Sequence, residues 1–142
     1  MTEIICSGGL FLAQDTQRFL LLLRAQGKTA GTWGLVGGKK EPTDITPTDT
    51  LRREIQEEIG MMPRINKTVP LEWYSSRDNS FSYHTYVLLV SREFVPQLND
   101  EHTGYAWVGL NAWPRPLHSG LKNTLNSRTI RGKLETILDV IG

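Results

Sequence analysis

The segment from Thr46 to Gly60 carries the signals of an α-helix with a defined start, a buried face and an end. Thr46 is a favourable N-cap, Pro47 suits the first helical position, and Asp49 can complete a capping box. Apolar residues then recur at every fourth position: Leu51, Ile55 and Ile59. This stripe predicts a face that packs on a core. Gly60 is the residue type that most often ends a helix.

A neighbouring face of the same helix is acidic. Glu54, Glu57 and Glu58 lie on adjoining turns, where like charges destabilise an isolated helix by roughly 0.2–0.5 kcal/mol per pair. A bound cation removes this repulsion, and all-oxygen clusters suit hard ions such as Mg²⁺, which neutralise phosphate oxygens. The alternative is an ordinary solvated helix face. The acidic face therefore indicates metal-assisted chemistry on a phosphate compound, unless it is only solvated.

Short apolar runs separated by turn residues predict a sheet around this helix. The expected strands cover residues 4–12, 19–24, 32–36, 71–76, 81–90 and 105–109. Residues 39–48 hold two prolines and no apolar periodicity, so they are expected to form a loop. Residues 128–141 have apolar side chains at helical spacing and predict a second amphipathic helix. Many short strands with two helices favour an α+β, mixed-sheet sandwich.

Composition and charge are those of a small globular domain. A chain of 142 residues fits one domain, residues 1–142, and its net charge of +1 gives no broad basic field for nucleic acid. The longest apolar run, residues 19–23, is too short to cross a membrane. The single Cys6 rules out an intramolecular disulfide and favours a reducing compartment, and no secretory signal pattern is visible. We expect a cytoplasmic protein without a membrane or nucleic-acid partner.

The residues before and within the helix resemble the Nudix box of the MutT-like hydrolases, G-x5-E-x7-R-E-U-x-E-E-x-G-U, with U an aliphatic residue. The run from Arg53 to Met61 matches at every fixed position, and Gly38 begins a stretch similar to the first half. That half departs from the pattern, because Asp44 replaces the loop glutamate and eight residues precede Arg53 instead of seven. Counted back from Arg53, the glutamate position falls on Ile45. We therefore assign no role to Asp44 and expect a one-residue bulge in the loop.

The resemblance implies a Nudix-like α/β/α sandwich with a mixed β-sheet and a set of metal ligands. Glu57 and Glu58 would be the principal ligands of Mg²⁺, with Mn²⁺ as a substitute. Glu54 would be a further ligand or would help to orient the attacking water. The carbonyl of Gly38 would complete the metal shell. Arg53 would hold a glutamate in place by a charge-assisted hydrogen bond.

Members of the family often bring a further acidic residue from a loop after the box. Glu101 is the expected counterpart, with Asp100 as the alternative, and would be a second metal ligand or the general base. An acidic pair in a turn is also common without any such role. His84 and His102 are interpreted as surface or packing residues rather than as ligands.

Substrate-binding residues are expected outside the box. Lys39 and its neighbour Lys40 attract phosphates, with a solvated loop as an equal alternative. Four strand aromatics either pack in the core, which is the favoured interpretation, or stack on a base: Trp73, Tyr74, Phe81 and Tyr83. Of these, Tyr83 is the candidate for substrate binding. Asn111 begins a proline-rich segment, residues 111–120, that is expected near the entrance of the site.

The resemblance implies hydrolysis of a nucleoside diphosphate linked to another group, by water attack on the pyrophosphate. A nucleoside triphosphate or a nucleotide sugar is the expected substrate. The alternatives are a catalytically silent nucleotide-sensing domain, an ADP-ribose or dinucleotide pyrophosphatase, and a hydrolase of nucleic-acid ends. Silent relatives usually lose a glutamate of the box, and all three are present here. The resemblance is also compatible with a homodimer.

Overall fold

The computed structural model describes residues 3–141 and contains seven strands and three helices in that range. In chain order they are β1 (Ile4–Ala13), β2 (Arg18–Arg24), β3 (Trp33–Gly34), β4 (Val36–Lys39), α1 (Pro47–Ile59), β5 (Lys67–Ser75), β6 (Phe81–Val90), β7 (His102–Val108), α2 (Ser119–Asn126) and α3 (Arg128–Ile141). None of the helices in the described part of the chain is long and apolar enough to cross a membrane.

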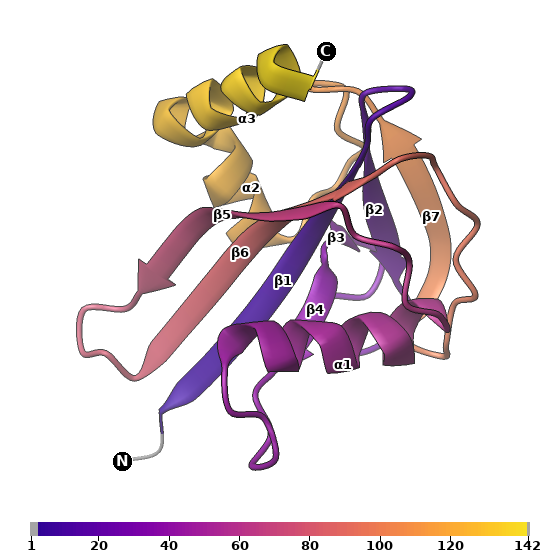
Figure 1. Ribbon diagram of the computed structural model, residues 1–142. Coiled ribbons are helices and arrows are strands. Elements are labelled where there is room, and N and C mark those ends of the chain that lie inside the picture. Colours follow the sequence, from indigo (N-terminus) through magenta and orange to yellow (C-terminus); the bar gives the residue numbers. More distant parts are fainter. Residues whose placement is uncertain (1–2, 142) are drawn as a thin grey trace.

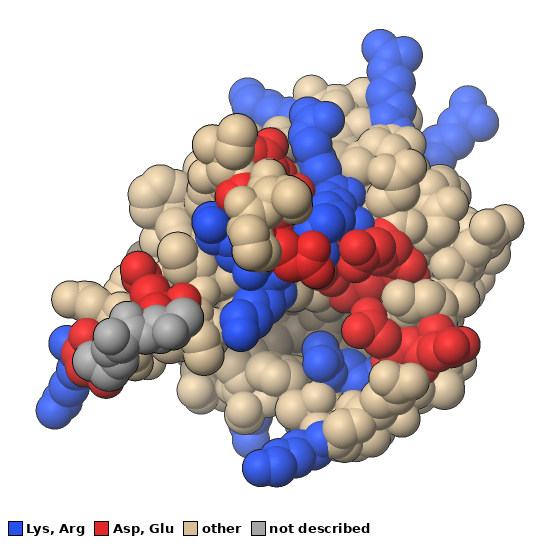
Figure 2. Space-filling view, turned by 90° about the horizontal axis from the view of Figure 1, so that it is seen from below, with Lys and Arg blue, Asp and Glu red and all other residues tan. Residues whose placement is uncertain are grey.

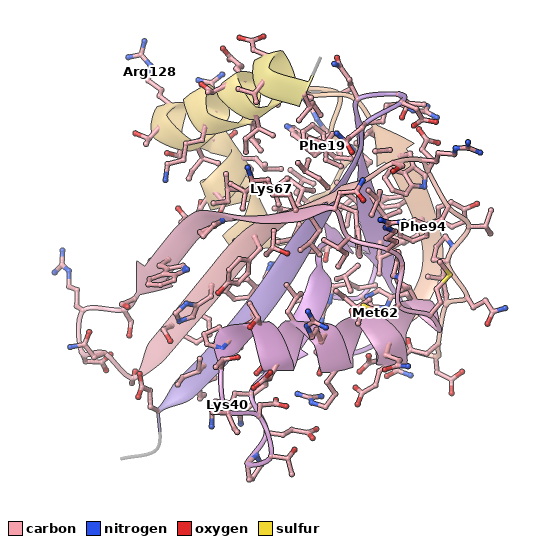
Figure 3. All side chains as sticks on the ribbon, in the orientation of Figure 1. Phe19, Lys40, Met62, Lys67, Phe94 and Arg128 are labelled. Atoms are coloured by element: carbon pink, nitrogen blue, oxygen red, sulfur yellow. The ribbon has the colours of Figure 1, made fainter. Side chains whose placement is uncertain are left out.

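The mixed sheet lies between two helical layers, with α1 on one face and α2 and α3 on the other (Figure 1). Each face has its own apolar cluster. Leu51 and Ile55 of α1 are 2% and 1% exposed and pack against the first face, and burial of each side chain contributes roughly 1.5–3 kcal/mol. On the other face, Phe19 lies in the cluster that contacts α3 (Figure 3). The expected α/β/α sandwich is confirmed.

Strand pairing brings three distant segments to one region beneath α1. β1 runs parallel to β6 along its whole length, and the first half of its other edge pairs with β4, where Ser7 lies opposite Gly38. β1 pairs with β2 only at its far end. β2 in turn pairs with β7, which places His102 opposite Arg24. The glycine pair of β4, the end of β2 and the start of β7 therefore surround the same space.

The helix signals of residues 46–60 are confirmed in full. The Thr46 side chain accepts a hydrogen bond from the Asp49 backbone N–H, and the Asp49 carboxylate accepts one from the Thr46 backbone N–H, which completes the capping box. Gly60 has φ 72°, the left-handed conformation in which glycine carries no steric penalty. The local sequence alone thus determines where α1 begins and ends.

Several strand boundaries differ from the prediction. The expected strand over 32–36 is divided at Leu35, because β3 pairs with β2 whereas β4 crosses to β1. β5 begins at Lys67 and includes Pro70, which is tolerated because β5 is an edge strand. β7 begins at His102, three residues before the expected start. These differences arise from pairing partners, which local patterns do not specify.

Two further differences concern side chains and a missed helix. Trp73 and Tyr74 are 67% and 52% exposed, so the core interpretation is wrong for both; the end of β5 projects past the helices (Figure 1). Helix α2 was not predicted, because its eight residues offer only one short apolar repeat. That repeat, Leu121 and Leu125, is buried against the α3 cluster.

Candidate active site

Three glutamates converge at the space beneath α1. Glu54 and Glu58 lie one turn apart on α1 and are both buried, whereas the exposed Glu101 comes from the loop before β7. One carboxylate oxygen of each lies within 4.8 Å of the others. All-oxygen donors of this kind suit Mg²⁺ or Mn²⁺. The described residues therefore fit a divalent metal ion, with Glu54, Glu58 and Glu101 as the side chains that would hold it.

The glycine pair of β4 lets α1 approach the sheet closely. The Gly37 N–H donates to Glu58 Oε1 across 3.0 Å. A Cβ atom at Gly38 would lie only 2.6 Å from the carboxyl carbon of Glu54, so any larger side chain would displace this carboxylate. The position of Glu54 thus requires a residue without a side chain at position 38. The metal-binding role of the Gly38 carbonyl is a separate point and remains a prediction.

Arg53 lies at the centre of a hydrogen-bond network that fixes the acidic face. Its Nη1 donates to Glu54 Oε1 across 2.7 Å, and its Nη2 donates to Asp44 Oδ2 across 2.9 Å and to the Lys39 carbonyl across 2.9 Å. The guanidinium therefore connects the loop, the end of β4 and the helix. Its hydrogen bond fixes the position of the Glu54 carboxylate.

The view that Asp44 has no role is wrong. Its carboxylate is 6% exposed and accepts hydrogen bonds from Arg53, from the Thr50 hydroxyl and from the Glu41 N–H. These donors hold the pKa of Asp44 well below its ordinary value, with Arg53 as the largest cause. The next residue, Ile45, has a side chain that is 86% exposed, and its N–H donates to Asp49 Oδ2. Asp44 keeps its contact with Arg53, and the expected one-residue bulge of the loop stays a prediction.

Glu57 lies apart from the three converging carboxylates. Its side chain is 52% exposed, and its Oε2 lies 3.4 Å from Arg53 Nη1. Among the described residues, the group within metal-binding distance consists of Glu54, Glu58 and Glu101. The metal-binding role of Glu57 remains a prediction, and in this structure it would require a side-chain rotation.

The carboxylates open into a cavity of about 540 Å³. Its lining consists of Arg24, Gly37, Gly38, Lys39, Lys40, Glu41, Pro42, Glu54, Glu58, Glu101 and His102. Acidic and basic side chains meet on this face of the molecule (Figure 2), and Lys40 lies on the loop that precedes α1 (Figure 3). A cavity lined by both signs of charge can hold a metal ion at its carboxylates and phosphate oxygens at its basic side chains.

The cavity also contains two residues that the sequence analysis did not assign to it. Arg24 ends β2, where its Nε donates to the Thr29 hydroxyl across 2.7 Å. His102, interpreted as a packing residue, is buried and lines the cavity beside Glu101. Burial, and then the charge of Arg24, lower the pKa of His102, so its ring is neutral near pH 7. The sequence signal that could have identified Arg24 is a single arginine directly after the apolar residues 19–23.

The predicted substrate-binding residues occupy three different positions. Lys39 lines the cavity. Tyr83 lies on β6 with its ring against Gly8, and it packs on the α3 side of the sheet; among the described residues it is not part of the cavity lining. Asn111 follows the far end of β7, about 20 Å along that strand from Glu101. The roles of all three in substrate binding remain predictions.

Burial raises the pKa of Glu58, and the adjacent Glu54 carboxyl raises it further. A buried pair of carboxyls cannot carry two negative charges without a compensating cation. Binding of a divalent metal ion here would therefore favour deprotonation of Glu58, as expected for a carboxylate ligand. The repulsion between Glu54 and Glu58 is the one that the sequence predicts for the acidic face of this helix.

Comparison with known proteins agrees with this geometry. The NUDIX domain family matches residues 7–127. The chain belongs to the Nudix family. It is similar to the nucleoside triphosphatase NudI of Escherichia fergusonii, with 31% identity over 109 residues that cover 68% of this chain and 77% of that protein. The NudI protein of an Escherichia coli strain is 30% identical over the same length and coverage. The chain is thus a Nudix pyrophosphohydrolase.

Solved structures share the fold at lower sequence identity. A MutT NUDIX hydrolase from Burkholderia pseudomallei has a TM-score of 0.67 and 24% identity, covering 90% of this chain and 99% of that one. The NUDIX domain of Shewanella oneidensis NrtR, solved with ADP ribose, has a TM-score of 0.71 and 19% identity, covering 94% and 90%. An ADP-ribose pyrophosphatase from Streptococcus suis has a TM-score of 0.69 and 21% identity, covering 96% and 92%.

Proposed function

We propose that this Nudix hydrolase cleaves nucleoside triphosphates to a nucleoside monophosphate and pyrophosphate, in a reaction that depends on Mg²⁺ or Mn²⁺. The convergence of Glu54, Glu58 and Glu101 on a cavity with basic side chains carries this proposal. The printed activity of the NudI relatives, nucleoside triphosphatase, supports the substrate class.

The charged groups in and behind the cavity would have different tasks in this reaction. Glu54, Glu58 and Glu101 would hold the metal ion, which neutralises phosphate oxygens and makes a water molecule more acidic when it is bound. Arg24 and Lys39, which also line the cavity, would bind phosphate oxygens. Arg53 holds the Glu54 carboxylate by a hydrogen bond. In this proposal the carboxylates bind the metal ion and the basic side chains bind the phosphate oxygens.

Glu101 is the proposed general base. It is the exposed member of the three glutamates, and the Asn99 side-chain amide is its neighbour at 3.3 Å. It would accept the proton as the water oxygen attacks phosphorus, while the bond from that phosphorus to the bridging oxygen breaks and pyrophosphate leaves. A carboxylate that is open to solvent can release this proton again after each turnover.

The test is a substrate panel with product identification. Purified protein is incubated with Mg²⁺ and with nucleoside triphosphates, nucleotide sugars, ADP-ribose or dinucleotides, and products are separated by anion-exchange chromatography. Hydrolysis in ¹⁸O water shows which phosphorus is attacked. Monophosphate and pyrophosphate from a triphosphate support the proposal. Cleavage of ADP-ribose alone, or no turnover of any compound, contradicts it, and the Glu58→Gln variant measures contaminating activity.

A further inference from the structure

A row of side chains crosses the sheet behind the metal-binding carboxylates. In the pairing of β4, β1, β6 and β5, Gly38 lies opposite Ser7, Ser7 opposite His84, and His84 opposite Trp73. Residues that pair directly across strands project on the same face, with neighbouring strands about 4.8 Å apart. The space beside Gly38 on this face holds the Glu54 carboxylate. Ser7 therefore lies between Glu54 and His84.

Two polar atoms in this row lack partners. Ser7 is fully buried, and among the described residues neither Ser7 Oγ nor His84 Nδ1 makes a hydrogen bond, although both atoms are inaccessible to solvent. Buried polar atoms without partners are rare because they lose their hydration without compensation. Two such atoms on adjacent, directly paired residues point to a shared partner that is not a side chain. Ordered water fills this role in many proteins.

The imidazole of His84 is held in a fixed orientation. The Trp73 ring lies over it with the ring centroids 4.9 Å apart and tilted by 59°. Burial lowers the pKa of His84, so one ring nitrogen donates and the other accepts near pH 7. The nitrogen that faces the interior, Nδ1, can thus bond one water, and the Ser7 hydroxyl can both donate and accept.

We propose that Ser7 and His84 bind one ordered water molecule between them and, through it, position the carboxylate of Glu54 for metal binding. Its partners would be Ser7 Oγ, His84 Nδ1 and a Glu54 carboxylate oxygen, and three is the usual number for a buried water. Arg53 holds Glu54 from the loop side at 2.7 Å, and the Ser7–His84 pair holds it from the sheet side. The inference rests on the proposed metal-dependent function, and Ser7 and His84 act as positioning residues.

Mn²⁺ binding to the protein without substrate tests the proposal, measured by electron paramagnetic resonance. Residues that orient metal ligands typically change metal affinity by about 10–100-fold, so Ser7→Ala and His84→Leu are each expected to weaken Mn²⁺ binding at least about tenfold. His84→Asn, which places an amide near the position of Nδ1, is expected to retain most of the affinity. Ser82→Ala is the matched control, because Ser82 is also buried on β6 but pairs with Ile5, away from Gly38.

A double variant separates a shared water from two independent effects. If one water joins the two residues, Ser7→Ala with His84→Leu weakens Mn²⁺ binding no more than the stronger single variant. Additive losses, or unchanged affinity in both folded single variants, overturn the proposal. A crystal structure that shows Ser7 and His84 in direct contact, without a water molecule, also overturns it. Thermal unfolding shows that each variant is folded.

The result is readable even if the proposed reaction is wrong. A wild-type protein that binds Mn²⁺ but cleaves no nucleotide contradicts the proposed function, while the affinities of the variants still decide the role of Ser7 and His84. A wild-type protein that hydrolyses triphosphates and loses no Mn²⁺ affinity in either variant contradicts only the inference.

Discussion

The Arg53 guanidinium donates hydrogen bonds to the Asp44 carboxylate from two nitrogens. Nε lies 3.2 Å from Oδ1, and Nη2 lies 2.9 Å from Oδ2. This fork geometry is specific to arginine and is stronger than a neutral hydrogen bond. The same guanidinium reaches Glu54 with its remaining nitrogen. The loop that precedes α1 and the acidic face of α1 are therefore held by one side chain, which connects Asp44 to Glu54.

Asp44→Asn is expected to lower the melting temperature at neutral pH and to change its pH dependence. Arg53, and then the Glu41 N–H, keep the pKa of Asp44 below its ordinary value of 3.8. A lowered folded-state pKa adds stability that is fully present above pH 4 and is lost as the pH falls further. Circular dichroism melts at pH 7 and pH 3 should show a smaller difference for the variant than for the wild type. An identical difference would remove Asp44 from the network; Asp15→Asn, at an exposed turn, is the control.

Glu58→Gln is expected to abolish metal-dependent turnover, with a loss of at least about 100-fold. The substitution removes a proposed metal ligand itself, whereas loss of a residue that only orients a ligand has a smaller effect. Glu57→Gln should have a smaller effect, since its carboxylate lies toward Arg53 and solvent. The measurement is kcat at saturating Mg²⁺. Equal losses in both variants would show that Glu57 rotates into the site, and wild-type rates in both would exclude the metal assignment.

Glu101→Gln is expected to slow hydrolysis at least about tenfold, within the usual range for loss of a general base. The amide keeps the shape of the side chain but cannot accept a proton. Single-turnover rates at saturating Mg²⁺ measure this loss in the chemical step. Asp100→Asn serves as the comparison, and a larger effect there would transfer the role to the neighbouring residue.

Mn²⁺ is expected to raise the melting temperature of the wild type and to leave that of Glu58→Gln nearly unchanged. Without a cation, burial and Glu54 raise the pKa of Glu58, so deprotonation of this group opposes folding as the pH rises above 4.5. A ligand at 100 times its dissociation constant adds about 2.7 kcal/mol to the free energy of unfolding. EDTA should reverse the gain. A shift of the same size in the variant would place the ion elsewhere.

Arg24→Gln is expected to raise KM for a triphosphate substrate more than it lowers kcat. Arg24 lines the cavity at the end of β2, and its Nε donates a hydrogen bond to the Thr29 hydroxyl across 2.7 Å. Loss of a bond to a charged phosphate oxygen corresponds to about 1.5–3 kcal/mol. Steady-state kinetics separate the two parameters. Arg92→Gln, at an exposed position, should leave both unchanged.

The sequence predicted those parts of the molecule that local chemistry determines. The start and end of α1 follow from Thr46, Asp49 and Gly60, and the burial of Ile55 follows from its place in the apolar stripe. The family resemblance, confirmed by the match over residues 7–127, supplied the sandwich fold. For α1, residue spacing and capping residues within one element were sufficient to predict the structure.

The parts that were missed depend on contacts between distant elements. The contact of Asp44 with Arg53 depends on the path of the loop in space, which the count of residues along the chain does not reveal. His102 and Arg24 meet only because β7 pairs with β2. The division into β3 and β4 likewise depends on strand pairing, because β3 pairs with β2 and β4 pairs with β1.

The exposed side chain of Ile45 marks a position at which this protein should tolerate substitution. Asp44 and Thr46, on either side of Ile45, are both anchored to α1 by hydrogen bonds, and the Ile45 N–H donates to Asp49 Oδ2. Substitution of the exposed Ile45 side chain is therefore expected to leave these anchors in place. The surface beside Asp44 can thus change its chemistry while the contacts that fix the start of α1 stay.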